Sequence, residues 1–100
     1  MPDPRLLLLD EPSAALDLPS REQLLDAIDL LAEEVAELSI VLVTHHVEEL
    51  PSCLTHALVL RDGHPLAAGP IGDVLTDPVL TEAYGMPLTV RHEDGRWNGP

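Results

Sequence analysis

Residues 6–17 of the chain read LLLLDEPSAALD, an apolar run followed by two adjacent acids and a proline. Periodicity does not separate a strand from a helix in four consecutive leucines. Because the run is short and lies between Pro4 and Pro12, we expect a buried strand. Its wholly apolar sequence predicts that both faces are covered, as in parallel sheets. Asp10 and Glu11 then follow the carboxyl end of this strand.

An amphipathic helix is predicted over residues 18–38, because apolar residues recur there at spacings of three and four. They are Leu24, Ile28, Leu31, Val35 and Leu38. The helix begins either with Asp17 as its N-cap and Pro19 in the first turn, or with a capping box of Ser20 and Gln23. The acids of the opposite face are expected to be solvated: Asp26, Asp29, Glu33, Glu34 and Glu37.

Residues 40–43, IVLV, are apolar and largely β-branched, and they predict a second buried strand. A strand, a helix and a strand in this order form a βαβ unit, whose strands are parallel with a right-handed crossover. The carboxyl ends of both strands then lie at one edge of the sheet, where α/β proteins bind ligands. We therefore expect Asp10, Glu11 and His45 to meet at a shared rim.

The remaining residues predict short elements. Residues 47–50 indicate a short helix stopped by Pro51, and residues 71–75 and 79–84 indicate two more. An Asp-Gly pair at 62–63, between apolar runs 57–60 and 66–68, predicts a hairpin. A second such pair at 94–95 predicts a small terminal hairpin of residues 88–91 and 96–97. The fold class is therefore α/β: parallel strands with a crossover helix, then a C-terminal β-hairpin and short helices.

The amino-acid composition excludes several classes of function. The formal net charge is −13, and the five basic residues are all Arg, so the sequence contains no Lys. Such a surface repels phosphates, which excludes a nucleic acid partner. Cys53 is the single cysteine, and the histidines away from His45 are too scattered to predict a metal site. No apolar run approaches the ~20 residues of a membrane helix, and no signal-peptide pattern is present. We expect a cytoplasmic protein with Glu48 and Glu49 solvated.

Residues 6–17 resemble the Walker B motif and the following D-loop of the ATPases of ATP-binding-cassette (ABC) transporters. Thr44-His45, after the second strand, resembles the switch-histidine loop of this family. Residues 57–64, with residues 67–70, are similar to the hairpin and small-Gly step that come next. The resemblance implies a partial P-loop NTPase core. Residues 1–76 would be the C-terminal part of the nucleotide-binding domain, and residues 77–100 a short helix and a small β tail.

The resemblance also implies roles for particular residues. Asp10 would bind the cofactor, holding Mg²⁺ through water, and Glu11 would be the catalytic base or orient the attacking water. His45 would contact the γ-phosphate of ATP. Asp17 would lie in the D-loop on the cofactor side, touching a second ATPase subunit across a nucleotide-sandwich dimer. A membrane permease would be a further partner, at the inner face of the membrane. Ala14 stands where the D-loop commonly has Ser, which removes one hydrogen bond of the dimer interface.

Two motifs of the family are missing from the 100 residues. Phosphate binding in this fold needs G-x-x-x-x-G-K-[ST], which a chain without Lys does not contain. The signature loop L-S-G-G-Q is also absent. Both precede the Walker B motif in the family, so we expect this chain to be a fragment of an ATPase. The fragment alone would be inactive, and the complete ATPase would hydrolyse ATP to drive transport. The alternatives are a non-catalytic fragment that pairs with or inhibits a full-length ATPase subunit, a pseudogene product, and a free-standing α/β domain.

The resemblance further places the Walker A strand between the strand before His45 and the strand of residues 57–60. Without that neighbour, each of these strands has an unpaired backbone edge, which favours aggregation. We therefore expect the isolated chain to be unstable or partly molten.

Overall fold

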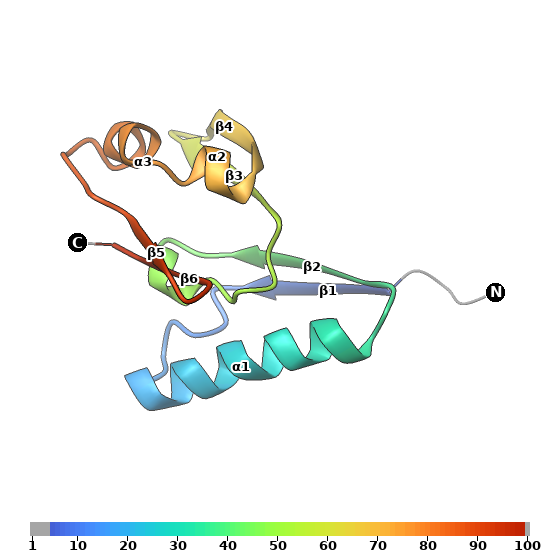
Figure 1. Ribbon diagram of the computed structural model, residues 1–100. Coiled ribbons are helices and arrows are strands. Elements are labelled where there is room, and N and C mark those ends of the chain that lie inside the picture. Colours follow the sequence, from blue (N-terminus) through green and yellow to red (C-terminus); the bar gives the residue numbers. More distant parts are fainter. Residues whose placement is uncertain (1–4, 100) are drawn as a thin grey trace. The chain divides into compact units, whose positions relative to one another are not determined.

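A computed structural model describes residues 5–99, and the chain divides into two compact units between Cys53 and Leu54 (Figure 1). The first unit contains β1 (Arg5–Asp10), α1 (Leu18–Glu34), β2 (Leu38–Val43) and the 3₁₀ turn η1 (Val47–Glu49). The second unit contains β3 (His56–Arg61), β4 (His64–Pro70), α2 (Ile71–Val74), α3 (Asp77–Tyr84), β5 (Arg91–Glu93) and β6 (Arg96–Asn98).

The predicted βαβ unit is present. β1 and β2 pair in parallel, with Leu7 opposite Ile40 and Asp10 opposite Val43. The helix α1 connects the two strands and runs along one face of the pair (Figure 1). This register brings the carboxyl ends of both strands to the same edge, because the last residues of β1 and β2 are partners.

The start of α1 is decided between the two predicted caps. Asp17 is the N-cap, since its Oδ1 accepts the N–H of Ser20 at 2.9 Å, and Pro19 lies in the first turn. The end of α1 differs from the prediction, because the helix stops at Glu34 rather than at Leu38. Val35 already has an extended backbone, and Leu38 begins β2 opposite Arg5. The β-branched Val35 loses little on leaving the helix, and the strand gains a ladder partner.

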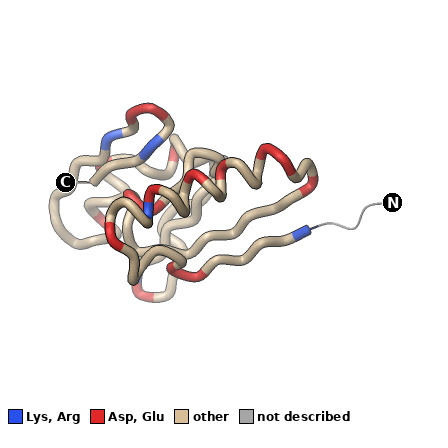
Figure 2. Tube along the Cα trace, turned by 90° about the horizontal axis from the view of Figure 1, so that it is seen from below, with Lys and Arg blue, Asp and Glu red and all other residues tan. Residues whose placement is uncertain are grey.

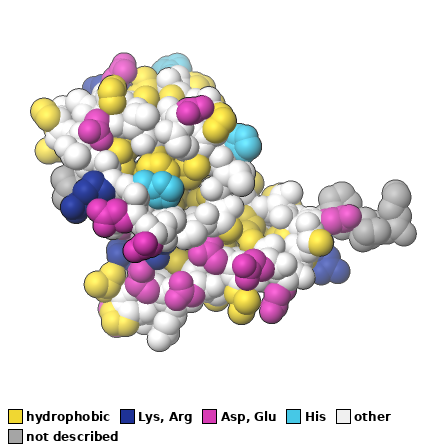
Figure 3. Space-filling view, in the orientation of Figure 1, with side chains coloured by type: hydrophobic (Ala, Val, Ile, Leu, Met, Phe, Trp, Pro, Cys, Tyr) yellow, Lys and Arg dark blue, Asp and Glu magenta, His cyan; other side chains and the backbone are white. Residues whose placement is uncertain are grey.

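The buried face of α1 also differs in detail from the prediction. Leu25, absent from the predicted stripe, is fully buried at 0% exposure, and Ile28 is 4% exposed. Leu31, predicted to be in the core, is 38% exposed. Acidic residues recur along α1 (Figure 2), and acidic side chains lie on the surface of the molecule (Figure 3). Asp29 is the exception among the acids predicted to be solvated, because it accepts the N–H groups of Ser52 and Cys53.

The two strands are covered on one face only, which contradicts the prediction of fully buried strands. Leu6 and Leu8 of β1 are 66% and 64% exposed, and Val41 and Val43 of β2 are 47% exposed. Leu7 and Leu9, which alternate with them, are partly buried. Successive side chains of a strand point to opposite faces, so a single helix covers only every second residue. We call the exposed set of Leu6, Leu8, Val41 and Val43 the open face.

The second unit consists of two hairpins with short helices between them. β3 and β4 pair antiparallel across Asp62 and Gly63, whose positive φ angles of 53° and 77° are those required by a type I′ turn. Within residues 5–99, β3 pairs with β4 alone and β2 with β1 alone. The terminal hairpin is shorter than predicted, because β5 begins at Arg91 and residues 88–90 are not part of it.

Short helices complete the second unit. The predicted helices are present as α2 and α3, and α3 ends at Gly85 in the left-handed conformation. Val74, Leu75 and Leu80 are buried, and the ring of Trp97 stacks on His92. No helix among the described residues has the length and apolar character that crossing a bilayer would require.

Candidate functional site

The acidic pair lies at the carboxyl end of β1. Asp10 is the last residue of the strand, and its side chain is exposed. Glu11 follows in a left-handed backbone conformation with a φ of 47°, and its N–H donates to the carbonyl oxygen of Val43 at 2.7 Å. A left-handed non-glycine residue is uncommon and is found preferentially where a side chain must be aimed in a particular direction. The hydrogen bond to Val43 fixes the Glu11 backbone to the end of β2.

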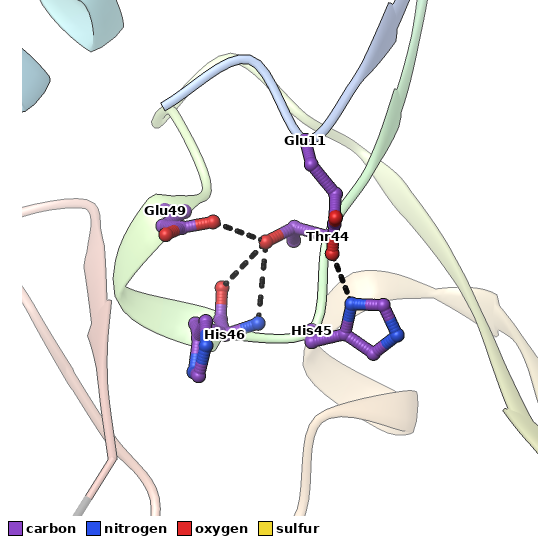
Figure 4. A network of polar contacts seen from close by, with 5 residues as sticks. All are labelled: Glu11, Thr44, His45, His46 and Glu49. Carbon is purple, nitrogen blue, oxygen red and sulfur yellow. Dashed lines mark hydrogen bonds and ion pairs between the residues drawn. The ribbon is translucent and has the colours of Figure 1, made fainter. Parts of the chain in front are cut away.

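The histidine of the second strand reaches this acid. His45 lies two residues after β2, and its Nδ1 is in hydrogen-bond contact with Oε1 of Glu11 (Figure 4). A carboxylate is only an acceptor, so Nδ1 carries the proton and Nε2 faces away from Glu11. The side chains are 76% and 40% exposed, so the pair is open to water. The rim predicted from the parallel strands therefore does bring Glu11 and His45 together.

This arrangement has defined chemical possibilities. A carboxylate beside a solvent-exposed imidazole can orient or deprotonate a water molecule, and the imidazole can hydrogen-bond an anionic group. The contact also fixes the tautomer of His45, because the carboxylate determines which ring nitrogen is protonated. An anionic ligand at the rim would be contacted by His45 and a water nucleophile by Glu11.

The residues around Asp10 satisfy only part of what a Mg²⁺ site requires. Within the described residues, no group of three or more His, Cys, Asp or Glu side chains is arranged to hold a metal ion. Mg²⁺, however, is usually bound by one or two carboxylates, several waters and the phosphates of a substrate rather than by a protein cage. An exposed carboxylate at a strand end satisfies the protein's share of such a site. Asp10 therefore fits a water-mediated role and not a site of its own.

Asp17 has a structural task in the chain. Its carboxylate caps α1 through the N–H of Ser20. The side-chain hydrogen bond of Ser20, followed by this backbone hydrogen bond, lowers the pKa of Asp17 below its usual value. The hydrogen bond found for this carboxylate is thus with α1 and not with Glu11 or His45. The structure joins the predicted site residues Glu11 and His45 and leaves Asp17 at the start of the helix.

The sequence analysis missed a group of hydrogen bonds that lies next to His45. Glu49 was expected in solvent but is 8% exposed, and its Oε2 accepts the hydroxyl of Thr44 at 2.5 Å. The Thr44 oxygen in turn accepts the N–H of His46 at 3.2 Å (Figure 4). Asp29 holds the next segment through the N–H groups of Ser52 and Cys53. A hydroxyl next to His45 and an acid one turn later were the available signals, but two adjacent acids are most simply interpreted as a solvated pair.

The chain is an α/β protein in which a parallel βαβ unit has an acid and a histidine in contact at its carboxyl strand ends, the edge where α/β proteins generally bind ligands. No family model matches the chain. The chain is 42% identical over 90 residues to the uncharacterized ABC transporter ATP-binding protein YlmA of Bacillus subtilis, covering 90% of this chain and 34% of that protein. It is 45% identical over 71 residues to the molybdenum import ATP-binding protein ModC of Shewanella oneidensis, covering 71% of this chain and 19% of that protein.

The fold agrees with this similarity. A solved structure of a metal-chelate type ABC transporter in an inward-facing conformation superimposes with a TM-score of 0.77, at 24% identity, over 95% of this chain and 38% of that chain. The chain belongs to the ATP-binding proteins of ABC transporters. It spans about a third of the length of the Bacillus subtilis relative.

Proposed function

We propose that this chain supplies the Walker B, D-loop and switch-histidine part of an ABC-type ATPase. The contact between Glu11 and His45 at the common end of β1 and β2 is the observation that carries the proposal. It joins the two residues to which the family resemblance assigns roles: Glu11 would act on the attacking water, and His45 would contact the γ-phosphate. Bound Mg²⁺ would supply charge neutralisation for the phosphates.

Each residue of the rim then has a distinct task. Asp10, exposed at the strand end, would help to hold Mg²⁺ through water. Glu11 orients or deprotonates the attacking water, and the left-handed backbone aims its side chain to the end of β2. His45 contacts the γ-phosphate through Nε2 while Nδ1 stays with Glu11. Asp17 is the D-loop residue nearest to the dimer partner, and capping α1 keeps that loop in a fixed conformation.

The partners follow from the same proposal. A second ATPase subunit would meet the D-loop across a nucleotide-sandwich dimer, and a membrane permease would bind the assembly at the cytoplasmic face of the membrane. Phosphate anchoring needs the Walker A loop with its Lys, which the 100 residues do not contain. The chain alone therefore binds Mg-ATP weakly, and equilibrium dialysis is expected to give no submillimolar affinity. Micromolar binding by the pure chain would contradict this part of the proposal.

The test completes the domain. The part of YlmA that precedes the stretch matched by this chain is fused to the full 100 residues, and we call this fusion the completed protein. The proposal expects Mg-dependent ATP hydrolysis by the completed protein. Glu11→Gln is expected to lower kcat by about 100-fold or more, since it removes the general base, while ATP binding remains.

Two further variants sharpen the result. His45→Ala is expected to lower kcat strongly, and His64→Ala, an exposed histidine of the second unit, is the matched control that leaves it unchanged. A completed protein that folds and binds ATP, yet hydrolyses it equally well with Glu11→Gln, would overturn the assignment of Glu11.

A second function is favoured by the open face and by the missing Lys: a non-catalytic fragment that binds an ATPase subunit. The chain added to intact YlmA distinguishes the two. Lowered ATPase activity of YlmA supports an inhibitor, whereas hydrolysis restored when the chain meets only the preceding part of YlmA supports a split enzyme. If neither effect is observed, the result would favour a pseudogene product.

A further inference from the structure

We propose that Thr44 and Glu49 are positioning residues that aim His45 at its substrate; this inference rests on the proposed function above. The observation is a closed ring of hydrogen bonds among Thr44, His46 and Glu49, the residues that flank His45. The Thr44 hydroxyl donates to Glu49 Oε2 at 2.5 Å, and the N–H of His46 donates to the Thr44 oxygen at 3.2 Å. The N–H of Glu49 donates back to the carbonyl oxygen of His46 at 3.1 Å. We call this ring the Thr44–Glu49 clamp, and Figure 4 shows the hydrogen bonds that the Thr44 hydroxyl makes in it.

The direction of the Thr44 proton follows from the distances. The hydroxyl has one proton and two acceptors within reach, Glu49 Oε2 at 2.5 Å and the carbonyl oxygen of His46 at 3.5 Å. The shorter contact is the stronger hydrogen bond, and a carboxylate is the better acceptor. The oxygen of Thr44 then remains free to accept the N–H of His46, so one side chain holds two partners at once.

His45 needs such a clamp. Its side chain is 76% exposed, so burial alone gives the imidazole little orientation. Its backbone lies beyond the last residue of β2, Val43, so the strand ladder does not fix it either. The clamp closes around residues 44–49 and thereby sets the Cα–Cβ direction of His45. The contact with Glu11 then selects the rotamer.

Burial of Glu49 supports a task beyond ordinary turn formation. A carboxylate at 8% exposure is costly to desolvate unless it is hydrogen-bonded. A neutral side chain or an exposed acid would form the same 3₁₀ turn without that cost. A buried charged acceptor, in contrast, gives Thr44 a strong and directional partner, which is what an exposed catalytic side chain requires from its support.

The first test is a double-mutant cycle in the completed protein. Glu49→Ala is expected to lower kcat by about 10- to 100-fold, with KM for ATP changed by no more than about twofold, because a misaimed group loses rate rather than affinity. In a His45→Ala background the same substitution is expected to lower kcat no further. An equal loss in both backgrounds, or a loss confined to KM, would overturn the proposal, since a purely structural acid acts regardless of His45.

Conservative variants provide the rescue. Glu49→Gln keeps a side-chain oxygen that accepts the Thr44 proton, and Thr44→Ser keeps the hydroxyl, so both are expected to retain most of kcat. Thr44→Val keeps the shape and removes the hydroxyl, and it should resemble Glu49→Ala. Glu48→Ala is the charge-matched control in the same turn and should leave kcat unchanged. Full activity of Thr44→Val would exclude the clamp.

A second measurement separates failure of the clamp from failure of the proposed function. A completed protein without any ATPase activity would overturn the proposed function and leave the clamp to be judged by NMR. In the isotope-labelled completed protein, nuclear Overhauser contacts between the His45 ring and the Glu11 side chain are expected for the wild type and for Glu49→Gln. They should be lost in Glu49→Ala. Contacts that persist in Glu49→Ala, or that are missing from the wild type, would overturn the clamp.

Discussion

Replacing Leu8 by Ala in the completed protein is expected to destabilise it by about 2–5 kcal/mol, the cost at a fully buried leucine. In the chain as it stands, Leu8 is 64% exposed, so only about a third of its side chain is buried. Complete burial of a leucine contributes about 1.5–3 kcal/mol, and a third of this is about 0.5–1 kcal/mol. The two values differ enough to tell whether the open face becomes covered.

The assay is urea unfolding of the completed protein, followed by circular dichroism. Leu25→Ala is the positive control, because Leu25 is already fully buried and should cost about 2–5 kcal/mol regardless. Leu30→Ala is the negative control on α1, where the side chain is 53% exposed and the loss should be near 1 kcal/mol. A loss of 1 kcal/mol or less for Leu8→Ala, with Leu25→Ala behaving as expected, would mean that the open face stays open and would refute the reasoning.

Three further predictions concern the chain by itself. Its unfolding should be broad and it should bind a hydrophobic dye, because the open face offers four apolar side chains to water; a sharp, cooperative transition would contradict this. Hydrogen bonds from the side chain and then the backbone N–H of Ser20 lower the pKa of Asp17 below the usual 3.8, so its ionised form is favoured by folding. Its contribution is present above about pH 4 and is lost as the pH falls through the lowered pKa; circular dichroism of the wild type should therefore lose more helix between pH 7 and pH 2 than Asp17→Asn, and equal losses would count against the cap. Burial, followed by the carboxylate of Asp29, raises the pKa of the Cys53 thiol to about 11. At pH 8 its thiolate fraction is on the order of 100-fold below that of an ordinary cysteine, so iodoacetamide should alkylate it far more slowly than the same thiol in urea, and equal rates would refute the burial.

The sequence predicted the meeting of Glu11 and His45 better than it predicted the core. Parallel strands joined by a helix have their carboxyl ends at one edge, and this topological rule was sufficient to bring Glu11 and His45 together. The Asp62–Gly63 turn was equally predictable, because a type I′ turn needs two residues that tolerate a positive φ. Such rules depend on connectivity and backbone conformation, which are local properties.

The errors have a different origin. The apolar run in β1 was interpreted as a strand buried on both faces, yet Leu6 and Leu8 are exposed. An apolar pattern indicates that a side chain favours burial, but it does not show whether the same chain contains a segment that covers that side chain. Glu49 was assigned to solvent, because a hydrogen bond across five residues of irregular backbone leaves no periodic trace. The early end of α1 at Glu34 reflects competition between helix propagation and strand pairing, which depends on tertiary context.

The site and the open face belong to the same pair of strands. Glu11 is fixed to Val43 by a backbone hydrogen bond, and Val43 is itself part of the open face. The rim can therefore be no more rigid than the strands beneath it, and those strands bury only one side against α1. The clamp and the Glu11–His45 contact set local geometry within a few residues, whereas covering the open face would hold that geometry still during catalysis. Under the proposed function, covering the open face would therefore also steady the contact between Glu11 and His45, because both depend on the same two strands.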